Sequence, residues 1–130
     1  MNNTTGPDQL AALKSSRVVY EYTVPARLKE QHDGSIIETV GIVQLQAQEE
    51  IIAGKEAGAD PTKLAWSLAK RCLWTVNGER VKDSDGSRDK FWNTMAPKLR
   101  SLCLTAYNDQ HSPEPEDADA FLGSCAVTAQ

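Results

Sequence analysis

The sequence predicts one α+β domain, in which an N-terminal antiparallel β-hairpin is followed by a small bundle of about four helices. Two patterns support this prediction. Apolar and polar residues alternate in the N-terminal third, which is the period of a strand, whereas further along the chain apolar residues recur three and four positions apart. The composition agrees, because 40% hydrophobic and 25% charged residues in a chain of 130 are typical of a globular domain.

Composition also divides the chain into three parts. Residues 1–16 are mostly polar and include Gly6 and Pro7, so we expect a flexible N-terminal arm. Residues 17–124 are expected to form the single α+β domain. Residues 125–130 follow Gly123 and are expected to form a loose C-terminal tail.

The first strand is predicted by the alternation from Val18 to Lys29. Pro25 falls on the polar face of this strand. Because proline has no backbone N–H to donate to a neighbouring strand, we expect the strand to lie at an edge of the sheet, at least near Pro25.

The partner strand follows a two-residue turn, Asp33-Gly34, and is rich in β-branched residues. With these two residues as the loop, Val24 faces Val43 and Lys29 faces Glu38. The pairing matches apolar with apolar and opposite with opposite charge, so it predicts this register.

Two helices are expected next. The first, within LQAQEEIIAGKEAGA, carries an apolar stripe of Ala47, Ile51 and Ile52 and ends before Gly58. The second begins at Asp60-Pro61, an N-cap followed by a proline at the first helical position. Its expected buried face consists of Leu64, Ala65, Leu68, Ala69, Cys72 and Leu73.

A second tight turn is predicted at Asn77-Gly78, between the short strands LWTV and ERV. The polar loop KDSDGSRD follows, and Asp85 or Ser87 can cap the next helix. An apolar stripe then runs through Pro97: Phe91, Met95, Leu99, Leu102 and Ala106. Proline cannot continue a helix, so we expect a break near Ala96 and a new helix from Lys98 to about Gln110.

The last predicted element is a short acidic helix within HSPEPEDADAFLGS, anchored to the domain by Ala118, Phe121 and Leu122. Its acidic residues stand in the first turns, where the helix dipole favours negative charge. This explains them better than an acid/base pair or a metal site.

Charge and cysteine usage exclude several classes of function. The net charge of −4 and pI of about 5.1 argue against a nucleic-acid partner. No apolar run approaches the ~18 residues of a membrane span, and the N-terminus lacks the features of a signal peptide. Cys72, Cys103 and Cys125 are far apart and form no C-x-x-C, which fits a reducing cytoplasm and argues against zinc.

No catalytic or cofactor-binding motif is recognisable. The acidic loop around Gly86 lacks the closing Glu of a calcium site. His32 and His111 belong to no readable triad, and the glycines form no nucleotide-binding pattern. We therefore expect a protein that is not an enzyme and has no cofactor or metal.

Five residues are candidates for contact with another protein: Trp92, Lys98, Arg100, Tyr107 and Phe121. Trp92 falls off the stripe of Phe91 and Met95, and tryptophan is enriched among binding hot spots. Lys98 and Arg100 can present positive charge to an acidic partner. The alternatives are a tryptophan at the margin of the core and an ordinary solvated helix face.

The segment FWNTMAPKLRSLCLTAYNDQHSPEPEDADAFLGS and the order of elements before it resemble the tail assembly chaperones of tailed bacteriophages. LQAQEEIIAG and LAKRCLWTVNGERV match two earlier parts of the family pattern, and the resemblance covers roughly residues 18–124. The closing pattern is matched by Pro97, Lys98, Leu102, Ala106, Tyr107, His111, Pro113, Phe121, Leu122 and Ser124. Ala96 departs from it where a capping Ser often precedes Pro-Lys, at a cost of about 1 kcal/mol to that helix start.

The resemblance implies a protein that acts in the host cytoplasm. It would bind the long helical tape-measure protein, keep it in solution and recruit tail-tube subunits. A structural subunit retained in the phage tail or in a contractile injection particle is the alternative, and a small enzyme or inhibitor is a third reading. Formation of a homo-oligomer stays open.

Overall fold

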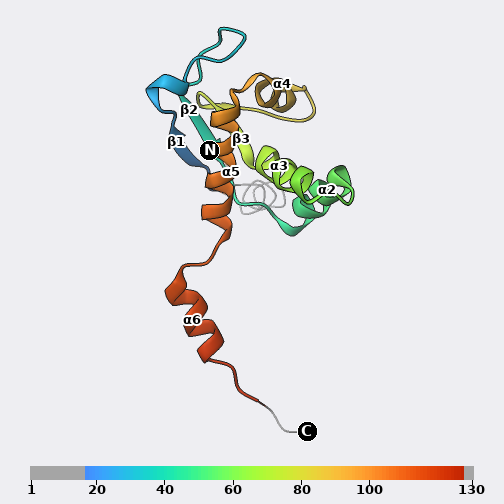
Figure 1. Ribbon diagram of the computed structural model, residues 1–130, viewed down its shortest axis with the longest axis vertical. Helices are drawn as coiled ribbons and strands as arrows, with labels where there is room; N and C mark the ends of the chain where they lie inside the picture. The colour runs from blue at the N-terminus through green and yellow to red at the C-terminus, as the bar shows by residue number, and fades with distance from the viewer. Residues whose placement is uncertain (1–16, 128–130) are drawn as a thin grey trace, which may run out of the picture.

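The computed structural model describes residues 17–127, and within this range one antiparallel sheet packs against helices (Figure 1). The sheet has four strands in the order β1 (Tyr20–Thr23), β2 (Thr39–Ile42), β3 (Leu73–Val76) and β4 (Glu79–Arg80). The helices are the 3-10 helix η1 (Ala26–Leu28), α2 (Ala47–Ala57), α3 (Pro61–Cys72), α4 (Ser87–Thr94), α5 (Pro97–His111) and α6 (Pro115–Gly123). The α+β class is confirmed, although the strands form two hairpins separated by α2 and α3.

The predicted edge position of the first strand is confirmed, but its length and register are not. β1 lies at the edge of the sheet and stops at Thr23, because Pro25 is the N-cap of η1, which interrupts the predicted strand. β1 pairs with β2 through Tyr20 and Ile42, and through Tyr22 and Val40, instead of in the predicted register. The register differs from the prediction because Ala26–Leu28 form η1 and are not available to extend the strand.

Beyond η1 the connection closes as a small hairpin of its own. Gly34 has a φ of 83°, and its N–H donates to the Gln31 carbonyl. The predicted pair of Lys29 and Glu38 does form, with 2.6 Å between Nζ and Oε2, because both residues lie on this outer part of the hairpin.

Local stop and start signals explain the next elements. The Asp60 carboxylate accepts hydrogen bonds from the N–H groups of Thr62 and Lys63, and α3 begins at Pro61 as predicted. Asn77 and Gly78 have φ of 53° and 80°, which is the conformation of a tight hairpin turn. The predicted break before Pro97 is confirmed, since α4 ends at Thr94 and α5 begins at Pro97.

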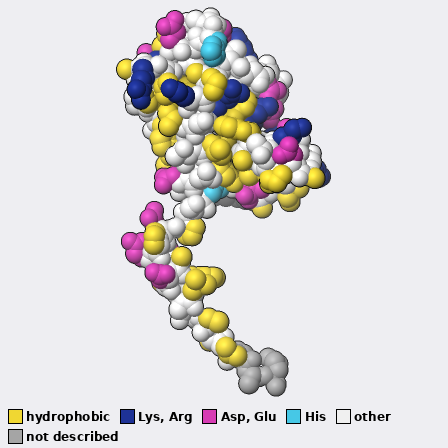
Figure 2. Space-filling view, viewed as in Figure 1, with side chains coloured by type: hydrophobic (Ala, Val, Ile, Leu, Met, Phe, Trp, Pro, Cys, Tyr) yellow, Lys and Arg dark blue, Asp and Glu magenta, His cyan; other side chains and the backbone are white. Residues whose placement is uncertain are grey.

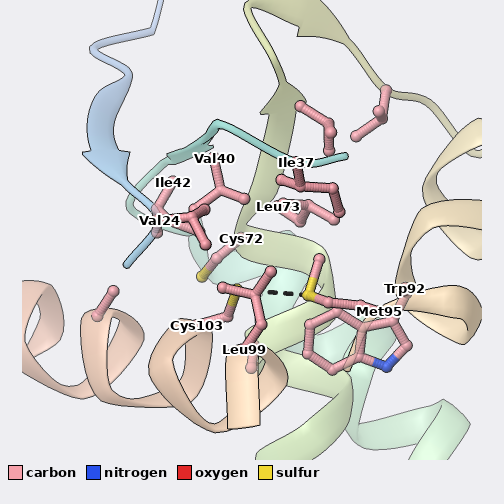
Figure 3. Packing of buried hydrophobic residues seen from close by; sticks show 14 residues of the cluster. Val24, Ile37, Val40, Ile42, Cys72, Leu73, Trp92, Met95, Leu99 and Cys103 are labelled. Atoms are coloured by element: carbon pink, nitrogen blue, oxygen red, sulfur yellow. Dashed lines mark hydrogen bonds between the residues drawn. The ribbon is translucent and has the colours of Figure 1, made fainter. Parts of the chain in front are cut away.

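The core lies between the sheet and helices α3, α4 and α5 (Figure 3). Ile37 and Leu73 come from the sheet side, and Met95 and Leu99 come from the helices. Trp92 is also part of this core, with 6% of its surface exposed, so its expected role as an exposed contact residue is wrong. α4 is a separate helix whose phase is independent of α5, and it turns Trp92 inward, whereas Phe91 is half-buried.

Other predicted core residues are exposed. On α2 the buried side chains are Ala53 and Ala57, whereas Ile51 and Ile52 of the predicted stripe face outward. Small residues at the contact let α2 approach α3 closely. Leu64, at the start of α3, and Leu102, on α5, are exposed as well.

The C-terminal helix α6 forms as predicted but does not pack where expected. It lies apart from the sheet and the other helices, beyond the end of α5 (Figure 1). Phe121 and Leu122 are 76% and 70% exposed, so the expected anchor is wrong. The predicted arm, residues 1–16, lies outside the described residues, and residues 125–127 of the tail are exposed. Among the described helices, none is both long and apolar enough to cross a membrane.

Candidate functional site: an apolar groove between β1 and α5

A groove of about 360 Å³ lies between the edge strand β1 and helix α5. Its lining is mostly apolar. The residues that form it are Tyr22, Thr23, Val24, Pro25 and Val40 from the sheet side, and Leu99, Leu102, Cys103, Thr105, Ala106 and Asp109 from α5. Val24, Val40, Leu99 and Cys103 form a buried floor, and Leu102, 41% exposed, stands at the rim.

The spacing of residues on α5 explains why a groove forms here. Leu99, Cys103 and Ala106 recur three and four positions apart and face the sheet. Two of these three side chains are small, so the helix leaves space beside the strand instead of filling it. Leu102 and Thr105 form the next row on the helix and line the open side.

The edge strand extends this apolar surface. Successive side chains of a strand point to opposite faces, so Val18, Tyr20, Tyr22 and Val24 share one face of the sheet. Val24 is buried and Tyr22 is half-buried in the groove, whereas Val18 and Tyr20 are exposed. The Tyr22 hydroxyl accepts a hydrogen bond of 2.7 Å from the Gln110 side chain, which fixes the ring beside α5.

The two ends of the groove differ in charge. Lys98 lies one helical turn before Leu102, and Arg27 lies two residues beyond Pro25; both are exposed. Asp109 lines the opposite end. Along α5 the charge therefore changes from basic Lys98, just before the first lining residue of the helix, to acidic Asp109, the last.

The cysteine in the groove floor is not suited to nucleophilic chemistry. Burial raises the pKa of the Cys103 thiol to about 12, so it is protonated at neutral pH. Burial, with a smaller contribution from Glu49, also raises the pKa of Cys72 to about 12. What the groove offers is an apolar surface for binding.

The predicted contact residues do not form one face. Lys98 lies on the groove side of α5, whereas Arg100 and Tyr107 lie on its opposite flank. Trp92 is buried, with its ring centre 6.2 Å from that of Trp66. Phe121 is exposed on α6, away from the groove.

Sequence reasoning missed the tyrosines of β1 and misassigned Leu102 to the core. A signal for the tyrosines was present, because Tyr20 and Tyr22 share one face of a strand that Pro25 places at an edge. No such signal exists for Leu102, whose spacing fits a buried stripe as well as a groove rim.

A second cluster, of charged residues around Trp74, is structural. The guanidinium of Arg80 lies 3.2 Å from the centre of the Trp74 ring, and that of Arg17 lies 4.7 Å from it. Asp83 is 2.9 Å from buried Arg88 and 3.3 Å from Arg71. Asp83 of the acidic loop therefore forms ion pairs that hold the loop in place. The described residues hold no group of three acidic, histidine or cysteine side chains placed to bind a metal.

His111 also has a structural role. Its Nδ1 lies 2.8 Å from the Tyr107 carbonyl, and its Nε2 accepts a hydrogen bond of 2.9 Å from the Leu45 N–H. Its ring stacks on Tyr107 with 4.2 Å between centres. The Nε2 contact holds the end of α5 against the segment that follows β2, whereas the Nδ1 contact lies within α5 and orients the ring.

In comparisons with known proteins, no family model, no curated protein and no solved structure matches the chain.

Proposed function

We propose that this chain is a non-enzymatic protein-binding module of phage tail assembly, which acts in the host cytoplasm as a tail assembly chaperone. Its groove would hold an apolar segment of the helical tape-measure protein and keep that protein in solution while tail-tube subunits gather. The observation that supports this proposal best is the apolar groove beside an edge strand, together with the sequence resemblance of residues 18–124.

The dimensions and chemistry of the groove suit a helix with an apolar stripe. Side chains that recur three and four residues apart on such a helix can enter a groove side by side. Leu102 and Tyr22 would supply the contact area, and Lys98 would meet acidic residues beside the stripe. An apolar lining binds its partner by burying apolar surface, without a covalent bond. Such binding suits a tape-measure protein that must later be released.

Co-expression with the tape-measure protein tests this proposal. The change Leu102→Asp places a charge at the groove rim, and we expect it to abolish co-purification of the tape-measure protein. Ile51→Asp is the matched control, because Ile51 is an exposed aliphatic residue on α2, outside the groove lining. Equal binding by the two variants would contradict the proposal.

A structural subunit of the tail or of a contractile injection particle is the second candidate. The exposed α6 favours it, since a projecting helix with an apolar stripe suits permanent contacts between subunits. Mass spectrometry of mature particles separates the two candidates: a chaperone is expected to be absent from them, and a structural subunit is expected at a fixed number of copies.

A further inference from the structure

Helix α6 carries an apolar stripe that no other element of the described chain covers. Phe121 and Leu122 are neighbours near the end of this nine-residue helix, and most of the surface of each is exposed. Ala118 lies one helical turn before them on the same side. Figure 2 shows hydrophobic side chains along α6, with acidic side chains at the end nearer the domain. Exposed apolar stripes of this kind mark contacts with other molecules.

The linker keeps α6 away from its own domain. Pro113 and Pro115 restrict the residues before them to extended conformations. Ser112 has φ −99° and ψ 131°, and Glu114 has φ −64° and ψ 147°. Two extended residues, each followed by a proline, do not reverse the chain, so α6 continues outward instead of folding back along α5.

Charge is divided unequally between α6 and the rest of the chain. Of 18 acidic residues, four lie in residues 112–130, a segment without Lys or Arg: Glu114, Glu116, Asp117 and Asp119. The remaining 14 (18 − 4) equal the 14 Lys and Arg residues, so the net charge of −4 belongs to the C-terminal segment. A basic surface next to the apolar stripe would complement this charge.

The groove between β1 and α5 provides such a surface. Its floor is apolar, and two exposed basic residues adjoin its lining in the chain: Lys98 directly precedes Leu99, and Arg27 follows Pro25 by two positions. From Lys98 to Asp109 the groove side of α5 is about 16 Å long, and α6, with nine residues, is about 14 Å long. Length, apolar surface and charge therefore agree between the two.

We propose that α6 of one copy of this chain docks in the groove of a second copy. Phe121 and Leu122 pack beside Leu102, and the acidic first turn of α6 lies near Lys98 and Arg27 of the receiving copy. The helix and the groove are different surfaces, so the contact is heterologous: a copy that has received a helix can still insert its own.

This contact goes beyond the proposed role in tail assembly and does not depend on it. Where both hold, α6 covers the groove of the free protein and a helical partner displaces it. Self-association is measured on the isolated chain, without a partner, so its failure leaves the tape-measure experiment unaffected.

Complementary variants test the contact by sedimentation over a range of concentrations. The wild-type chain is expected to self-associate. Phe121→Asp places a charge on the apolar stripe of α6, and Leu102→Asp places a charge at the rim of the groove. Each variant is expected to be monomeric. A mixture of the two is expected to form a one-to-one complex, because one variant keeps an intact groove and the other keeps an intact helix.

The controls separate docking from damage to the fold. Ile51→Asp is expected to associate like the wild type. If circular dichroism shows that Leu102→Asp is unfolded, Thr105→Asp replaces it, because Thr105 is an exposed residue of the same groove.

Lys98→Glu is expected to weaken association about fivefold at low salt. Lys55→Glu, the same charge change on α2, is expected to have no effect.

A disulfide between Thr105→Cys and the native Cys125 shows whether the helix comes from another copy. Mild oxidation is expected to link two chains, and Cys125→Ser in the same background is expected to remove the link. A monomeric wild-type chain, a mixture of variants that stays monomeric, or a link formed within one chain would each overturn the proposal.

Discussion

Gln31 is a buried polar residue, 4% exposed, that joins two parts of the fold. Its side-chain nitrogen donates to the carbonyls of Leu28 and Lys29, and its oxygen accepts a 2.7 Å hydrogen bond from the Ala96 N–H. The residue thus fixes the hairpin connection to the joint between α4 and α5. The same hydrogen bond satisfies the backbone at Ala96, whose own side chain cannot cap α5.

The change Gln31→Ala is expected to lower the free energy of unfolding by about 2 kcal/mol, because it leaves the Ala96 N–H without its partner. Urea denaturation followed by circular dichroism measures the change. Gln48→Ala is the matched control, since Gln48 is exposed on α2, and it is expected to change stability by less than about 0.5 kcal/mol. Equal effects of the two changes would contradict the role given to Gln31.

At the scale of elements, the start of α2 depends on a carboxylate. Glu49 forms a capping box with Gln46 and accepts a 2.8 Å hydrogen bond from Nη1 of Arg17. Burial raises the pKa of Glu49, but the hydrogen bonds from Arg17 and from the Gln46 backbone outweigh burial, and the pKa lies below its ordinary value. The charged form of Glu49 therefore stabilises the folded state.

A pH-dependent loss of stability follows for Glu49→Gln. Because the folded-state pKa is lowered, the contribution of Glu49 is complete above its unfolded-state pKa and is lost as the pH falls through the folded-state value. The variant is expected to be less stable than the wild type by about 0.5 kcal/mol at pH 7 and equally stable at strongly acidic pH. Urea denaturation at several pH values measures this difference, and a gap that widens on acidification would contradict it.

At the scale of the whole molecule, the three cysteines report on folding. Cys72 and Cys103 are buried in the core, whereas Cys125 is exposed. A thiol reagent added to the native protein is expected to modify Cys125 rapidly and the other two only when the domain opens. Spectrophotometric titration should therefore show one fast thiol out of three, and all three in denaturant. Rapid reaction of a second thiol would contradict the packing of the core.

Some elements could be predicted because single residues restrict their own backbone. Pro25 at the edge strand, Asp60-Pro61 at the start of α3 and the break before Pro97 lie where the sequence placed them. The register of the first hairpin could not be predicted in this way. It depends on η1, and the same residues could also have continued the strand.

The candidate site was predicted less well than the fold. Lys98 lies beside the groove, but Trp92 is buried, and Arg100 and Tyr107 lie on the other flank of α5. The spacing of apolar residues along α5 does not show which of two neighbouring rows of side chains faces the sheet. That choice is made by the packing of α5 against β2 and α3.

The sequence by itself determined the start of α3, the break before α5 and the turn at Asn77-Gly78, because prolines, glycines and capping residues act through their own backbone. The tertiary structure decided which faces are buried, which strands pair and where the groove opens. These features depend on contacts between segments far apart in the chain, and many different packings are compatible with one local pattern.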